Sequence, residues 1–221
     1  MEYAILTKDL TKYYGRLLAV DHVNLRVPFN TIYGFLGPNG AGKTTTIRML
    51  CGLTNVSSGD AMVNGYSVRK EAEKVKASIG VVQDISNLYP ELTCFDNLMF
   101  CAEMHGVPKR LRKERVLELL AFFGLEDRKN EKFANLSKGL KRRLTIAAAL
   151  VHKPKILLLD EPTLGLDVKS RRKMWKLIQA LKEEGLTIFL TSHNVYEVSR
   201  LSERVAVINK GRIVAEGSLQ S

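Results

Sequence analysis

The stretch GPNGAGKTT, residues 37–45, constrains the fold of this chain more than any other. Its three glycines permit backbone angles that turn successive N–H groups inward, an arrangement suited to surrounding an anion. The apolar segment TIYGFLG leads into the stretch, and a helical pattern from about Lys43 to Cys51 follows it. This order of strand, glycine-rich loop and helix predicts a loop that cradles phosphate groups.

Two side chains at the start of that helix add to the expected site. The Lys43 ammonium supplies a point charge for the outer phosphates, and the Thr44 hydroxyl suits an Mg²⁺ ion. The alternative, a glycine-rich turn with an unrelated lysine, leaves the preceding strand and the following helix unexplained. We therefore expect a phosphate site here.

Strand patterns dominate the first part of the chain. YAILTK, LLAVDHVNLRVP and SIGVVQ are typical of strands, because apolar residues alternate or form short runs. AMVNGYSV predicts a hairpin turned at Asn64–Gly65, a favoured two-residue turn. From about Ser86 to Leu150, helical periodicity replaces these strand signals.

The last third returns to strands and helices in alternation. KILLLD is a continuous apolar run, typical of a parallel strand covered on both faces. MWKLIQALKEEG predicts a helix, TIFLTSH a strand and VAVINKGRIVAEG a closing hairpin. The expected fold class is therefore α/β. A phosphate-loop core with a β-subdomain, residues 1–85 and 151–221, is interrupted by a helical subdomain over residues 86–150.

Composition indicates one globular domain in a reducing compartment. The 221 residues are 45% hydrophobic and 26% charged, which is ordinary for a folded protein. Cys51, Cys94 and Cys101 form no CxxC pair, so buried thiols are expected. No apolar run approaches the roughly 18 residues of a membrane helix, and no leader peptide is recognisable, so we expect a cytoplasmic location.

A formal net charge of +11 raises the possibility of a nucleic-acid partner. The runs PKRLRKER and KSRRKMWK have apolar residues at helical intervals and few aromatics, which favours solvated helix faces. The stretch NLSKGLKRR, residues 135–143, allows two interpretations. Its four cations favour a nucleic-acid patch, whereas its serine and glycine favour phosphate binding at a helix start.

Two adjacent carboxylates follow the apolar run ILLL. Asp160 falls at the carboxyl end of that strand, where α/β sheets place their ligand sites, and it suits a position beside Mg²⁺. Glu161 follows directly, and side chains alternate along an extended segment, so the two should point differently. One can serve the metal while the other deprotonates a water for in-line attack.

Two further polar residues end strands that we expect beside this one. His193 closes TIFLTSH, and a parallel arrangement would bring it to the same sheet edge as Glu161. A lone histidine is more often structural, but this placement favours a catalytic role. Gln83 ends IGVVQ, and its amide could contact Mg²⁺ or the attacking water. The other histidines lack such a position, and no transition-metal site is expected.

Together these elements resemble the nucleotide-binding domain of ATP-binding cassette (ABC) transporters, along essentially the whole chain. The resemblance implies that ATP and Mg²⁺ bind, with Thr44, Gln83 and Asp160 near the metal. It also implies an aspartate loop at LGLD, residues 164–167, and a ring at Tyr14 stacked on adenine, with Tyr13 the adjacent candidate. The loop residues implied as ATP contacts are Gly37, Pro38, Asn39, Gly40, Ala41, Gly42, Lys43, Thr44 and Thr45.

The resemblance favours the phosphate interpretation of residues 135–143. The family has a signature there, usually written LSGGQ, which closes over the γ-phosphate held by the opposite subunit. Ser137 and Gly139 match it, whereas Lys138 and Leu140 replace a glycine and the glutamine. The KGLKRR form is similar to that of exporter-type members. Members of the family often continue with another helix beyond the hairpin at GRIVAEGSLQS, so the resemblance leaves open a C-terminally truncated chain.

The implied function is that of the ATP-hydrolysing subunit of a transporter at the cytoplasmic face of the membrane. Two copies, or one copy and a related ATPase, would pair head-to-tail and drive separate transmembrane permease subunits. The form of the signature favours export as the direction of transport. The segment DISNLYPELTCFDNLMF is expected to dock on those subunits, unless its apolar residues only pack the subdomain.

Two rival functions are weighed against this one. The first is a soluble ABC ATPase acting on nucleic acid or ribosomes, which the positive charge supports but the single cassette does not. The second is an ATP-sensing module without hydrolysis, which the presence of Glu161, Gln83 and His193 disfavours. No nucleic-acid partner is therefore expected.

Overall fold

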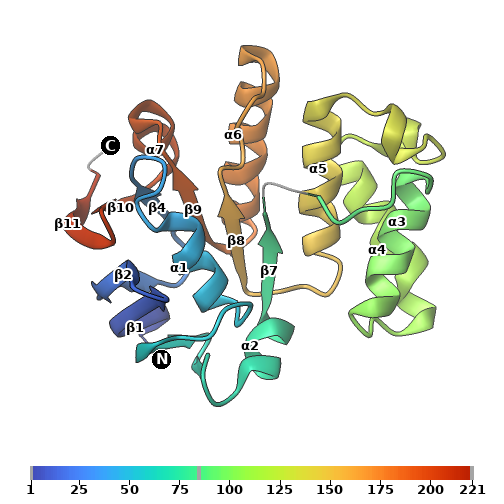
Figure 1. Ribbon diagram of the computed structural model, residues 1–221. Helices are drawn as coiled ribbons and strands as arrows, with labels where there is room; N and C mark the ends of the chain where they lie inside the picture. Colours follow the sequence, from blue (N-terminus) through green and yellow to red (C-terminus); the bar gives the residue numbers. More distant parts are fainter. Residues whose placement is uncertain (1, 84–85, 220–221) are drawn as a thin grey trace.

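The computed structural model describes residues 2–83 and 86–219. Within these residues the strands form a six-stranded and a five-stranded sheet (Figure 1). The larger sheet, ordered β11-β10-β4-β9-β8-β7, contains β4 (Ile32–Leu36), β7 (Ile79–Val82), β8 (Ile156–Asp160), β9 (Thr187–Ser192), β10 (Arg204–Asn209) and β11 (Arg212–Ser218). The smaller sheet contains β1 (Tyr3–Tyr14), β2 (Leu17–Val23), β3 (Arg26–Pro28), β5 (Ser58–Val63) and β6 (Tyr66–Ser67).

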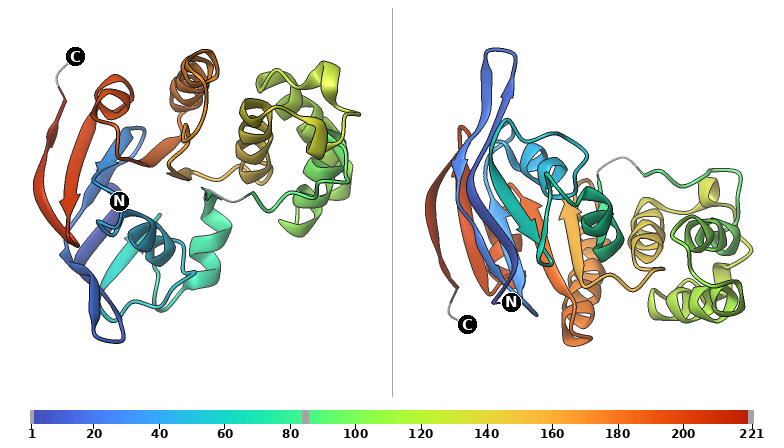
Figure 2. Two further views of the ribbon diagram at one scale, coloured as in Figure 1. Left: turned by 45° about the horizontal axis from the view of Figure 1, so that its top comes forward. Right: turned by 90° about the horizontal axis from the view of Figure 1, so that it is seen from below.

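The helices divide between the core and one side of the molecule. The core helices are α1 (Lys43–Leu50), α2 (Ala72–Ser78), α6 (Val168–Glu183) and α7 (Val195–Leu201). The helical part contains α3 (Cys94–Met104), α4 (Lys109–Phe122), η1 (Glu126–Arg128), η2 (Phe133–Asn135) and α5 (Lys138–Ala149). Figure 2 shows α3, α4 and α5 together at one side, away from the strands of the smaller sheet.

The larger sheet is parallel from β10 to β7, and only β11 runs antiparallel to its neighbour. Every residue of β8 and β9 is buried, as expected for strands covered on both faces. Successive residues of β8 enter different cores: Leu157 and Leu159 pack with the helical side, and Ile156 and Leu158 pack with α1 and the smaller sheet. The sheet therefore separates two hydrophobic layers.

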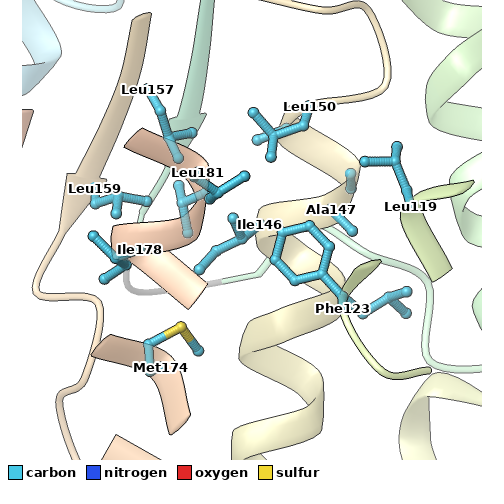
Figure 3. Packing of buried hydrophobic residues seen from close by; sticks show 14 of the residues in the cluster. Leu119, Phe123, Ile146, Ala147, Leu150, Leu157, Leu159, Met174, Ile178 and Leu181 are labelled. Carbon is cyan, nitrogen blue, oxygen red and sulfur yellow. The ribbon is translucent and has the colours of Figure 1, made fainter. Parts of the chain in front are cut away.

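One of these layers joins the sheet to the helical part. Figure 3 shows Leu157 and Leu159 of β8, Ile178 and Leu181 of α6, and Ile146 and Ala147 of α5 in one packed cluster that continues to α4. Each large side chain buried in this way contributes roughly 1.5–3 kcal/mol. Because α5 is part of this cluster, its position is set by the same contacts that hold β8.

Close backbone approach also fixes α5 against β7. A Cβ at Gly80 of β7 would lie 2.4 Å from the carbonyl oxygen of Ala149, the last residue of α5. Only glycine allows this contact, and it brings the helix that follows residues 135–137 against the edge strand of the larger sheet. In the described residues, no helix combines the length and the apolar character needed to cross a membrane.

Most predicted elements are present, with two differences. LLAVDHVNLRVP is not one strand, because the chain turns after β2 and the Thr7 hydroxyl, on β1, donates to Val23 O and accepts from Leu25 N. Helices α2 and α7 were not predicted; each has seven residues, too few for a clear period. Residue 85, on one side of the predicted boundary between residues 85 and 86, lies outside the described residues.

Candidate functional site

The glycine-rich loop lies between β4 and α1, as its sequence predicts. Gly42 caps α1 with φ +107° and no side-chain cap, so no capping side chain occupies the free N–H groups of the first helical turn. Gly40 has φ +76°, and a Cβ at Gly42 would lie 2.7 Å from Ala19 O. Both positions therefore require glycine, and the loop forms a concave array of backbone N–H groups that suits an anion.

This loop is the floor of a cleft of about 590 Å³, within the range of small-molecule sites. Nine of the residues predicted from the sequence line the cleft: Tyr14, Asn39, Gly40, Gly42, Lys43, Thr44, Thr45, Asp160 and Glu161. Gly37, Pro38 and Ala41 belong to the loop but do not line the cleft. Tyr14 rather than Tyr13 faces the cleft, and its ring is about half exposed.

Lys43 holds a buried positive charge at the centre of the loop. Its ammonium donates to Gly37 O at 2.8 Å and to Pro38 O at 3.1 Å, and it lies 3.2 Å from Glu161 Oε1. Only 6% of the side chain is exposed. Two carbonyls and a carboxylate thus compensate a charge that would be costly to bury alone. The lysine points along the loop toward the end of β8.

The end of β8 places two carboxylates in different surroundings. Asp160 is buried, and its Oδ1 accepts a hydrogen bond from the Thr191 hydroxyl of β9 at 2.5 Å. The same hydroxyl accepts from Glu161 N at 3.1 Å. The sequence suggested an extended backbone at Glu161, but the φ of this residue is +48°, in the left-handed region. The two side chains make different contacts because the backbone turns at Glu161, and not through strand alternation.

The Glu161 carboxylate lies between two basic groups. Its Oε1 is 3.2 Å from Lys43 Nζ, and its Oε2 is 3.0 Å from His193 Nδ1. Oε1 is buried and accepts no regular hydrogen bond among the described residues, so the Lys43 ammonium is its partner. A carboxylate that a histidine orients at the wall of a cleft can accept a proton from a water molecule bound there.

His193 reaches this position because β9 runs parallel to β8, with Asp160 paired to Thr191 in the register. The prediction that a parallel arrangement brings His193 to the same sheet edge as Glu161 is therefore confirmed. Gln83 follows β7, the other neighbour of β8, but it is not part of the cleft lining. Gln83 makes its contact through the backbone, where Gln83 O accepts from the Arg142 guanidinium at 2.5 Å.

Ser137 and Gly139 lie outside the cleft, at the start of α5. The Ser137 hydroxyl caps the helix by accepting from Leu140 N at 3.4 Å, and the residue is exposed. Gly139 packs close to Ser170, where a Cβ would lie 3.0 Å from the hydroxyl oxygen. A single copy of the chain thus does not bring these residues to its own phosphate loop.

The cationic stretch after Ser137 contacts this same chain at every basic position. Lys138 lies over Gly165, Lys141 over the Phe133 ring, Arg143 donates to Phe123 O, and Arg142 donates to four backbone carbonyls. These side chains therefore have structural partners within the fold. A row of free cations, as a nucleic-acid patch requires, is not what this stretch presents.

Several residues that contribute to the site were not predicted from the sequence. Lys210 and Gly211, the turn between β10 and β11, line the cleft, and Gly211 N donates to Ala41 O of the phosphate loop at 2.9 Å. The sequence shows a turn there but nothing about what lies opposite. Arg142 was considered only as part of a basic stretch, and no local pattern indicates the carbonyls that it binds.

Comparison with known proteins places this site in a family. The pattern of the family described as "ABC transporter" matches residues 20–164. The linearmycin resistance ATP-binding protein LnrL of Bacillus subtilis is 41% identical over 96% of this chain and 68% of its own length. The daunorubicin/doxorubicin resistance ATP-binding protein DrrA of Streptomyces peucetius is 42% identical over 97% of this chain and 65% of its own. The chain thus spans about two thirds of these relatives.

Solved structures agree with this assignment. The cbiO1 protein of Clostridium perfringens, part of an ABC transporter complex, has a TM-score of 0.91 at 29% identity, covering 99% of this chain and 90% of that one. The ATP-binding cassette MJ0796, in a dimeric post-hydrolysis state with ADP and Pi, has a TM-score of 0.87 at 28% identity, covering 98% and 99%. This chain belongs to the ABC transporter family, and it is an ATPase cassette of that family.

Proposed function

We propose that this chain powers an export transporter by hydrolysing ATP between two cassettes. The observation that carries the proposal is the position of the Glu161 carboxylate, 3.2 Å from Lys43 Nζ and 3.0 Å from His193 Nδ1, on the wall of a cleft floored by a phosphate loop. In this assignment Glu161 is the general base for the attacking water, and His193 orients it.

The remaining roles follow from position and donor chemistry. Lys43 and the N–H groups of the loop bind the phosphates, and the ring of Tyr14 stacks on the adenine. Thr44, which is exposed toward the cleft, and Asp160 supply oxygen atoms of the type Mg²⁺ prefers, and the bound ion would neutralise charge on the phosphates. Gln83 is assigned to the metal or the attacking water, although its side chain lies off the cleft lining.

Pairing of two cassettes accounts for the exposed signature. Ser137 and Gly139 lie outside the cleft of their own chain, and the N-terminus of a 12-residue helix follows them. That arrangement suits an anion presented by a second chain, the γ-phosphate of a nucleotide bound there. The partner is a second copy or a related ATPase subunit, and the dimeric state of the MJ0796 cassette supports this arrangement.

The permease subunits are proposed to dock on the segment around residues 86–100, with the cassette at the cytoplasmic face of the membrane. Leu88, Cys94 and Leu98 of this segment pack inside the helical part, whereas Tyr89 and Phe100 form an exposed pair with ring centroids 5.2 Å apart. Exposed aromatic rings are typical of protein interfaces. Asp84 and Ile85, where the expected docking segment begins, lie outside the described residues.

Direction and organisation complete the proposal. LnrL and DrrA are named for resistance to antibiotics, and other relatives are named for Nod factor export, which favours export over import and over a nucleic-acid or ribosomal role. We assign residues 1–85 and 151–221 to the catalytic core with its β-subdomain, and residues 86–150 to the helical subdomain that carries the signature.

The test of catalysis is Glu161→Gln, which keeps the size of the side chain but removes its basicity. Turnover of ATP should fall roughly 100-fold or more, while ATP affinity stays close to that of the unchanged chain. Turnover that is near normal would remove Glu161 as the base.

The test of the transporter role is affinity capture of the tagged protein from detergent-solubilised native cells, with and without nuclease. Stoichiometric recovery of a multi-span membrane protein in both samples is the expected result. Recovery of ribosomal or chromosomal partners that nuclease abolishes, without a membrane subunit, would support the rival function instead.

A further inference from the structure

The side chain of Arg142, in the second turn of α5, binds backbone carbonyls at the carboxyl ends of β7 and β8. Its guanidinium donates to Gln83 O at 2.5 Å, Asp160 O at 2.6 Å, Glu161 O at 3.0 Å and Pro162 O at 3.1 Å. Three of these carbonyls are consecutive, and the fourth belongs to the segment after β7. One rigid planar group thus sets the path of the chain just past β8.

We propose that Arg142 is a positioning residue: it holds the backbone of Glu161 in its catalytic conformation and links that backbone to the signature helix α5. The inference rests on the proposed role of Glu161 as general base. Arg142 does not line the cleft, so it is not expected to touch the nucleotide held there.

The backbone of Glu161 needs such support because its φ is +48°. A residue with a Cβ stays in the left-handed region only where its surroundings hold it there. On one side Glu161 N donates to the Thr191 hydroxyl, and on the other Glu161 O accepts from Arg142 and from Leu164 N. These contacts hold both peptide groups of the residue, and with them the direction of the carboxylate toward Lys43 and His193.

The link to the signature follows from the position of Arg142 on α5. Ser137 caps this helix, and Arg142 lies five residues further on, about 7–8 Å along the helix axis. A helix transmits displacement along its length, so a shift of its N-terminus moves the guanidinium that binds Glu161 O. When the nucleotide of a partner chain binds the signature, the resulting shift of α5 would in this way change the position of Glu161, the general base in the same chain as that signature.

A purely structural role would look different from a positioning role. If Arg142 only fastened α5 to the sheet, its loss would lower stability and nucleotide affinity together with turnover. The adjacent Arg143 offers a matched control, because it lies on the same helix and donates to Phe123 O at 3.4 Å, inside the helical part. Among the described residues, Arg143 makes no hydrogen bond with residues 160–162.

The experiment compares Arg142→Lys and Arg142→Met with Arg143→Lys and Arg143→Met in the full chain. Steady-state ATP hydrolysis gives kcat and KM, fluorescence titration with a nucleotide analogue gives Kd, and thermal unfolding gives Tm. Both Arg142 variants should lose about tenfold or more in kcat, because a displacement of about 1 Å at a catalytic group has effects of that size. KM and Kd should change less than about threefold, and the Arg143 variants should keep their kcat.

The double variant with Glu161→Gln separates the two proposals. If Arg142 acts through Glu161, adding Arg142→Lys to Glu161→Gln should lower residual turnover no further. Normal kcat in a folded Arg142→Lys chain would overturn the inference, as would equal losses in kcat and ATP affinity; if Arg142→Met fails to fold, Arg142→Lys decides. An active Glu161→Gln chain would instead overturn the proposed function on which the inference rests.

Discussion

Thr191→Val tests how the end of β8 is held, because the two side chains have nearly the same shape. The Thr191 hydroxyl donates to the buried Asp160 carboxylate at 2.5 Å and accepts from Glu161 N at 3.1 Å. Valine removes both bonds. A hydrogen bond to a charged group contributes about 1.5–3 kcal/mol, and an unsatisfied buried N–H costs about 1–3 kcal/mol. Water from the neighbouring cleft can relieve part of this, so we expect the free energy of unfolding to fall by roughly 2–4 kcal/mol.

Thr187→Val on the same strand is the matched control. Thr187 is as fully buried as Thr191, but its hydroxyl accepts one bond, from Asn30 N at 2.9 Å, and neither partner is charged. Its loss should cost about 1 kcal/mol. Urea unfolding at constant pH, followed by circular dichroism, measures both values.

The same variant should also lower catalytic turnover, since Glu161 N loses its acceptor while the phosphate loop is untouched. Equal losses of stability in Thr191→Val and Thr187→Val would refute the argument. They would mean that the carboxylate and the amide find other partners at no cost.

Three further outcomes are expected. Lys43→Ala should weaken ATP binding by about tenfold or more, because it removes a buried positive charge that faces the phosphates. Unchanged ATP affinity in a fluorescence titration would contradict the proposal that Lys43 binds the phosphates. Ser137→Arg should abolish ATP-dependent pairing in size-exclusion chromatography while a single chain still binds ATP; intact dimers would place the signature elsewhere. Burial lowers the pKa of His152 below its ordinary value of 6.5, so the unfolded chain binds the proton first as pH falls. The free energy of unfolding should therefore decrease as the pH falls below about 6.5, and His152→Gln should flatten that decrease. An unchanged slope in that variant would show that other groups cause it.

Local sequence determined the parts of the site that lie on single strand–loop–helix units. The spacing of Gly37, Gly40 and Gly42 before Lys43 requires a turn that only glycine permits, so the phosphate loop could be predicted without its neighbours. Apolar runs that end in Asp160 and His193 could likewise be predicted to share an edge, because parallel strands in a covered sheet end on the same side.

Tertiary structure alone decided which groups surround these residues. The turn at Lys210–Gly211 reaches the cleft because β10 pairs with β4, and nothing near it in sequence indicates that pairing. Arg142 belongs to a cationic stretch that could equally face solvent or nucleic acid. It binds the carbonyls after β8 because Gly80 lets α5 approach β7 closely and the apolar cluster holds α5 beside the sheet. A side chain's partners depend on such packing between distant segments, which residue spacing along the chain does not encode.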